Sequence, residues 1–151
     1  MMGLMEDEVF RAFTTYASVV AVKMVLMSPL TAYFRFTRGA FANAEDVALK
    51  PPEERKKLLR TDPDVERVRR CHQNDLENVV PFLALGLLYS LSGPELSCAL
   101  LHFRLFVGSR IFHTVSYVCT LPQPCRALSF IVGLLTNLSM AYRLLSNVMV
   151  L

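Results

Sequence analysis

Long apolar segments constrain the fold of this chain more than any other feature. Residues 9–34 contain only two charged side chains, Arg11 and Lys23. At a rise of 1.5 Å per residue, a helix of this length crosses the roughly 30 Å hydrocarbon core of a bilayer. Three more apolar segments follow, and 53% of the 151 residues are hydrophobic, with a mean hydropathy of +0.37. The pattern predicts an all-α membrane protein of one domain, a bundle of four transmembrane helices.

The sequence also predicts where these helices begin and end. Thr61 and Asp62 ahead of Pro63 form a typical helix start. The uncharged part of the second segment, residues 79–92, is short for a span, so the polar stretch before it should complete the crossing. We expect helices at about 9–34, 63–92, 95–120 and 126–149, and a loop at about 35–62.

Basic residues are concentrated around the first connection. Ten of the sixteen Lys and Arg residues lie between positions 35 and 72. Because an excess of Lys and Arg marks the cytosolic loops of membrane proteins, this loop should face the cytosol. Four crossings then place both termini on the opposite side of the membrane.

The polar stretch at residues 67–78 immediately precedes the apolar run at residues 79–92. On a helix, Glu66, Arg70, Asn74 and Glu77 fall within roughly 80° of one another, with Gln73 close beside them. His72 and Asp75 point to the opposite side and could pair with each other. Ionisable groups cost roughly 2.5–3.5 kcal/mol each at the centre of a membrane helix, so this stretch is a candidate functional site.

Polar residues from four segments should converge on the cytosolic side of the bundle. The topology brings together the end of the first helix, the start of the second, the end of the third and the start of the fourth. These ends carry Arg35, then Arg70, Asn74 and Glu77, then Arg110, His113 and Tyr117, and then Arg126. Charges placed by chance would be scattered over both ends.

The side chains in this set indicate what it binds. Arginines take carboxylates as bidentate partners, Glu77 can take an ammonium, and an arginine near a thiol favours the thiolate. The expected ligand is therefore a small, mainly anionic molecule with at least one ammonium. The four cysteines lack metal or redox spacing, so we predict no metal site and reduced thiols. No Gly-rich phosphate loop is present, and the net charge of +3 gives no support to nucleic-acid binding.

Motifs spread over nearly the whole chain are similar to those of a known family. They are Asp7-Glu8-Val9-Phe10, Phe41-Ala42-Asn43, Glu66-Arg67-Val68-Arg69-Arg70, His72, Asn74-Asp75-Leu76-Glu77-Asn78, Pro81-Phe82-Leu83, the run 87–94, the run 102–108, Leu121-Pro122-Gln123-Pro124 and the run 138–145. With these motifs the chain resembles the microsomal glutathione transferases of the MAPEG superfamily, and among them the type 1 enzymes.

The resemblance implies a specific enzyme architecture. A homotrimer would bind glutathione, as a co-substrate, in clefts between subunits that open to the cytosol. The enzyme would conjugate glutathione to hydrophobic electrophiles and reduce lipid hydroperoxides, in the endoplasmic reticulum membrane and the mitochondrial outer membrane. The implied glutathione contacts are Arg35, Arg69, Arg70, His72, Asn74, Glu77, His113 and Tyr117. Arg126 matches the arginine that steadies the thiolate, which makes it the candidate catalytic residue.

One departure from the type 1 pattern and two alternative functions bear on this expectation. Val47 stands where type 1 enzymes usually carry a cysteine, so activation through that thiol is not expected. A prostaglandin E synthase-like isomerase of the same fold is one alternative, but Gln73 and Ala127 stand where the synthases have arginine and serine. A non-enzymatic membrane adaptor is the other, and Arg126 argues against it because a purely binding site needs no thiolate stabiliser.

Overall fold

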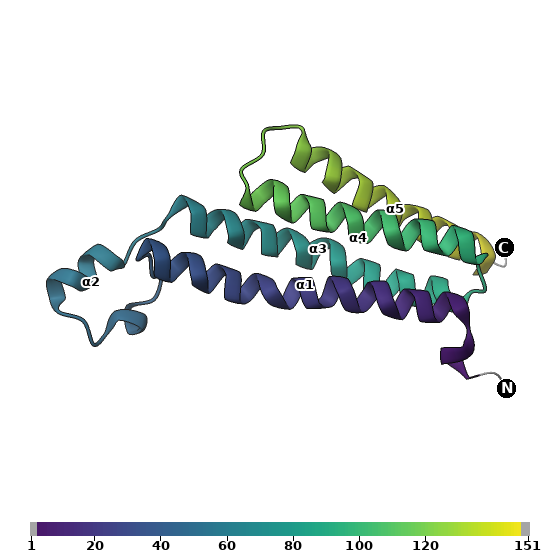
Figure 1. The fold of residues 1–151 in the computed structure, drawn as a ribbon, viewed down its shortest axis with the longest axis horizontal. Helices are drawn as coiled ribbons and strands as arrows, with labels where there is room; N and C mark the ends of the chain where they lie inside the picture. Colours follow the sequence, from purple (N-terminus) through teal and green to yellow (C-terminus); the bar gives the residue numbers. More distant parts are fainter. Residues whose placement is uncertain (1–2, 149–151) are drawn as a thin grey trace.

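The computed structural model describes residues 3–148, and this part of the chain contains five α-helices. Four are long and lie side by side, while the short α2 projects beyond their ends (Figure 1). The helices are α1 (Glu8–Arg38), α2 (Pro52–Leu58), α3 (Pro63–Leu91), α4 (Leu96–Val118) and α5 (Cys125–Val148), with short 3-10 helices at Leu4–Glu6 and Ala44–Val47. The expected end of the last helix, residue 149, lies outside the described residues.

Two of the long helices are long and apolar enough to cross a membrane. These are α1, with a mean hydropathy of 1.5 over its most apolar stretch, and the 23-residue part Cys125–Asn147 of α5, with 1.4. Few residues of either stretch are buried inside the chain, so most of their apolar surface faces outward. An outward-facing apolar surface is what a lipid-exposed helix requires.

Local capping explains where α1 and α3 begin and where α1 ends. The carboxylate of Asp62 accepts hydrogen bonds from the backbone N–H of Asp64 (2.9 Å) and Val65 (3.4 Å), so α3 begins at Pro63 as its sequence predicts. Asp7 caps α1 in the same way. At the other end, Gly39 adopts a φ of 57°, a left-handed conformation that favours glycine.

The helices α3 and α4 form the centre of the structure. Helix α1 packs against both of them on one side, and α5 packs against both on the other (Figure 1). An aromatic cluster fills the middle of the core, where Phe82 of α3 stacks on Phe106 of α4 with ring centroids 4.0 Å apart. Stacked aromatic pairs contribute about 0.5–1.5 kcal/mol beyond the area they bury.

Helices α1 and α3 approach each other closely at Gly86. A Cβ atom added there would lie 2.7 Å from Cε2 of Phe13. The ring of Phe13 has little room to move, because it packs against Phe82 and Phe103 at centroid distances of 6.1 and 5.7 Å. We therefore expect Gly86→Ala to destabilise the protein by about 1–3 kcal/mol, seen as a lower thermal unfolding temperature of the detergent-purified protein.

Gly108 of α4 provides the matched control for this prediction. A Cβ added there meets no atom of the described residues within 4 Å. Gly108→Ala should be neutral or stabilising, by up to about 1 kcal/mol, because alanine is the better helix former. If both variants melted at the same temperature, the close approach at Gly86 would not constrain the packing.

The connection between α1 and α3 is more ordered than a simple loop. Helix α1 continues to Arg38, so Arg35 lies in its last turn rather than in the loop. Arg60 donates through Nη2 to the carbonyl of Arg38 at 2.6 Å, and Arg38 pairs with Asp64 at 2.6 Å. These contacts hold the last residues of the connection and the start of α3 against the C-terminal end of α1. The sequence did not predict α2, a seven-residue helix in a strongly polar stretch.

Candidate functional site

The predicted polar residues gather at the end of the long helices that carries the α1–α3 connection (Figure 1). The end of α1, the start of α3, the end of α4 and the start of α5 all lie there. The convergence inferred from the topology is therefore present. These residues do not form one site within the chain, however, because most of them line one of two separate cavities, and Glu77 and Arg110 line neither.

The first cavity lies between α1 and α3 and has a volume of about 520 Å³. Three arginines give it a positive lining, and a salt bridge of 2.8 Å to Glu66 holds one of them, Arg69. The predicted site residues in its wall are Arg35, Arg69, Arg70 and His72, and Gln73 lines it as well. Several cationic donors around one cavity suit a ligand with carboxylates.

The second cavity, of about 440 Å³, lies between α3, α4 and α5. The guanidinium carbon of Arg126 lies 5.0 Å from the centroid of the Tyr117 ring, a cation–π arrangement. The Tyr117 ring in turn lies 5.0 Å from that of His113. The predicted site residues in this wall are Asn74, His113, Tyr117 and Arg126, beside the less polar Ala127 and Phe130.

The packing around α3 separates residues that its periodicity places on neighbouring faces. At about 100° per residue, Asn74 lies some 130° from the middle of the face formed by Glu66, Arg69, His72 and Gln73, but only about 40° from Arg70, which lines the first cavity. Helix α1 covers that face, while α4 and α5 approach the side of Asn74. Glu77 points between the two sides; it is exposed and accepts a weak hydrogen bond of 3.4 Å from Gln73.

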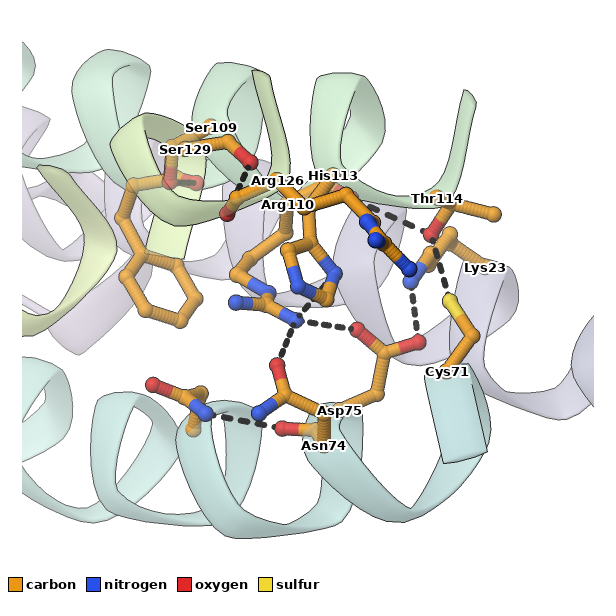
Figure 2. A network of polar contacts seen from close by, with 12 residues as sticks. Lys23, Cys71, Asn74, Asp75, Ser109, Arg110, His113, Thr114, Arg126 and Ser129 are labelled. Atoms are coloured by element: carbon orange, nitrogen blue, oxygen red, sulfur yellow. Dashed lines mark hydrogen bonds and ion pairs between the residues drawn. The ribbon is translucent and has the colours of Figure 1, made fainter. Parts of the chain in front are cut away.

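A buried ionic network supports the second cavity from behind (Figure 2). Asp75 and Arg110 are both fully buried and form a salt bridge of 3.0 Å. Lys23 of α1 pairs with the other carboxylate oxygen of Asp75. The same Nη2 of Arg110 also approaches Oδ1 of Asn74 at 2.8 Å and Nδ1 of His113 at 3.0 Å. This network connects three helices to two of the predicted site residues.

The network corrects one sequence-based interpretation. His72 and Asp75 were expected to be able to pair, yet the ion pairs of Asp75 are with Lys23 and Arg110. His72 instead lines the first cavity. Neither Lys23 nor Asp75 was among the predicted ligand contacts: Lys23 stands in the sequence only as a charge within an apolar segment, and Asp75 only as a member of the candidate stretch 67–78. The signal that could have found them was the opposite sign of their charges in segments expected to be membrane-embedded.

Comparison with known proteins shows the family to which this chain belongs. The chain matches the sequence profile of the MAPEG family over residues 13–146 and belongs to that family. It is 63% identical over 145 residues to microsomal glutathione S-transferase 1 of Homo sapiens, covering 95% of this chain and 94% of the relative. The protein of the same name from Rattus norvegicus is 59% identical over the same shares. Prostaglandin E synthase of Homo sapiens is 37% identical over 142 residues, or 94% of this chain and 91% of the relative.

Proposed function

We propose that this protein is a membrane-bound glutathione transferase whose glutathione sites form between copies of the chain. The observation that carries the proposal is the presence of two complementary partial sites at one end of the molecule. One offers arginines for carboxylates, and the other offers Arg126 with an aromatic and hydrogen-bonding wall. Relatives 59–63% identical over 95% of the chain are named as microsomal glutathione S-transferases.

The two partial sites have the chemistry that glutathione requires. The arginines of the first cavity bind its carboxylates, and Glu77 binds its ammonium. Asn74, His113 and Tyr117 hold the peptide portion near Arg126, which stabilises the thiolate. The thiolate sulfur then attacks the electrophilic carbon, the leaving group departs with the bond electrons, and the thiol proton has already passed to water. Ala127 and Phe130 give the electrophile an apolar surface beside Arg126.

A ring of chains brings the two partial sites together. They lie on different faces of α3, so one chain cannot close them around a single small molecule. A head-to-tail contact between the first cavity of one chain and the second cavity of the next closes into a ring when the rotation permits. We propose a homotrimer, as the resemblance implies, with four membrane-crossing helices in each chain.

The direct test of this function is a conjugation assay. Detergent-purified protein is mixed with glutathione and a chloronitrobenzene, and the thioether product is followed by absorbance. Product should form at a rate that saturates with glutathione and is proportional to protein. A rate equal to that of the buffer alone would refute the transferase proposal.

Reduction of lipid hydroperoxides is proposed as a second reaction of the same site. Two glutathione molecules are oxidised to the disulfide, while the hydroperoxide is reduced to an alcohol and water. The synthase alternative is less favoured, because Gln73 and Ala127 both line the candidate cavities. These are the two positions at which the synthases are expected to carry arginine and serine.

The proposed location is the endoplasmic reticulum and the mitochondrial outer membrane, with the sites facing the cytosol. We expect protease added to intact microsomes to cut within residues 38–60, because the basic residues concentrate there. Epitope tags at the two termini should be protected until detergent is added. Protection of this connection together with loss of both tags would reverse the orientation.

Glu77 gives a prediction specific to glutathione. Glu77→Gln should raise the glutathione Kd by about tenfold or more, because it removes the partner of the ammonium. The side chain is exposed and makes only a weak contact within the chain, so oligomer size should not change. Calorimetric titration with glutathione and size-exclusion chromatography measure the two quantities. A smaller oligomer that bound glutathione with normal affinity would assign Glu77 a role in assembly instead.

A further inference from the structure

We propose that Arg110 is a positioning residue that turns Asn74 and His113 into hydrogen-bond donors toward the ligand. Arg110 is held in this role by the buried Asp75 and, through it, by Lys23. The inference rests on the proposed glutathione site, which it deepens by assigning how two side chains of that site are oriented.

The guanidinium of Arg110 can only donate hydrogen bonds. All five N–H groups of arginine are donors, and it has no acceptor. The atoms that Nη2 of Arg110 approaches must therefore accept. They are Oδ1 of Asn74 at 2.8 Å, Oδ1 of Asp75 at 3.0 Å and Nδ1 of His113 at 3.0 Å.

The remaining polar atoms of Asn74 and His113 determine what these two residues offer to a ligand. When Oδ1 of Asn74 faces Arg110, the Nδ2 amide group is the one left for a ligand. When Nδ1 of His113 accepts, the imidazole carries its proton on Nε2, which then donates. Both residues line the second cavity. They therefore present N–H groups to it, which favours a ligand with carbonyl or carboxylate oxygens.

Ion pairing with Asp75 holds Arg110 in place. The guanidinium is fully buried, and two cations, Lys23 and Arg110, share the single carboxylate of Asp75 (Figure 2). A buried charge is tolerated when it is paired and hydrogen-bonded, so Asp75 fixes the guanidinium on α4 against α3. Lys23 adds the same constraint from α1. Preorganised donors of this kind need no rearrangement when the ligand arrives.

Another histidine in the same chain has the opposite tautomer. Nδ1 of His102 lies 2.7 Å from the carbonyl oxygen of Cys98, which can only accept, so His102 carries its proton on Nδ1. Its Nε2 accepts from the hydroxyl of Ser139 at 2.9 Å. A nitrogen-15 spectrum of histidine-labelled protein should thus contain both tautomers, assigned with His102→Gln and His113→Gln.

The test combines this spectrum with kinetics on two arginine variants of α4. Arg110→Met removes the donor but leaves Lys23 and Asp75 as a neutral pair, so no unpaired charge remains buried in the interior. We expect the His113 signals to move while those of His102 do not, and the KM for glutathione to rise by about tenfold, with the KM for the electrophile unchanged. Arg104→Met is the control, because Arg104 is exposed and lies outside both cavities described above.

Two results would overturn the inference. One is a wild-type spectrum in which His113 carries its proton on Nδ1, and the other is an Arg110→Met protein with an unchanged KM for glutathione. The wild-type spectrum tests the tautomer of His113 even if Arg110→Met fails to fold. It is recorded without glutathione, so the tautomer can still be read from a wild-type protein that does not bind glutathione. Failure to bind glutathione would refute the proposed function and not this inference.

Discussion

Replacing Arg126 by glutamine should lower the rate of glutathione conjugation at neutral pH by roughly tenfold. A free thiol has a pKa near 8.5, so only a few per cent of it is thiolate at neutral pH. A cation held nearby in a poorly solvated cleft lowers the pKa of the thiol by about one to two, equivalent to roughly 1.4–2.7 kcal/mol. Arg126 is suited to this role, because Tyr117 fixes its guanidinium from α4.

The pH dependence distinguishes this role from a structural one. The relative advantage that Arg126 gives is largest at and below the lowered pKa of the thiol, and it disappears above the ordinary value of that pKa. Above about 8.5 both proteins hold thiolate, so the loss should shrink as the pH rises. The measurement is the thiolate absorbance of bound glutathione against pH, with Arg104→Gln as control. A titration that stays where it is in the parent protein would leave Arg126 only an anchoring role at the membrane surface.

The sequence predicted the end of the molecule at which the candidate site residues lie, for a physical reason. The order of the apolar segments predicts which helix ends lie together. The basic residues around the α1–α3 connection predict which side of the membrane these ends face. Arg35, Asn74, His113 and Arg126 could be assigned to that end without any coordinates. The start of α3 could also be predicted, because the Asp62 cap is a local interaction that depends on adjacent residues.

The division of the site into two cavities could not be predicted in the same way. A helical projection gives the direction of Arg69 or Asn74 around the axis of α3, but not which helix faces that direction. Only the packing of α1 on one side and of α4 and α5 on the other separates them. Asp75 was missed for a related reason. Pairing rules for one helix suggest His72 as its partner, whereas Lys23 is 52 positions away in the sequence.

Mixing two impaired variants should raise the rate of conjugation above that of either variant if the proposed site is shared between chains. Arg126→Gln impairs the second cavity and leaves the first intact, while Arg35→Gln impairs the first and leaves the second intact. Each alone should be a poor enzyme at low glutathione concentration, because every contact between its chains contains a defect. In a randomly mixed ring, about one quarter of the contacts join the two intact cavities.

Two controls make the mixing experiment specific. Tyr117→Phe with Arg126→Gln combines two defects in the second cavity, so it should show no rescue. Separately purified variants combined after assembly should also show none, since their chains do not exchange within the assay. Equal expression of the two chains is checked by intact mass.

The rate of conjugate formation by co-expressed Arg35→Gln and Arg126→Gln chains is the most direct test of the shared site. The proposal predicts a rate of about one quarter of wild type, well above either variant alone. If both cavities served one chain by themselves, the mixture would show only the average of the two variants. That average would contradict a glutathione site shared between chains.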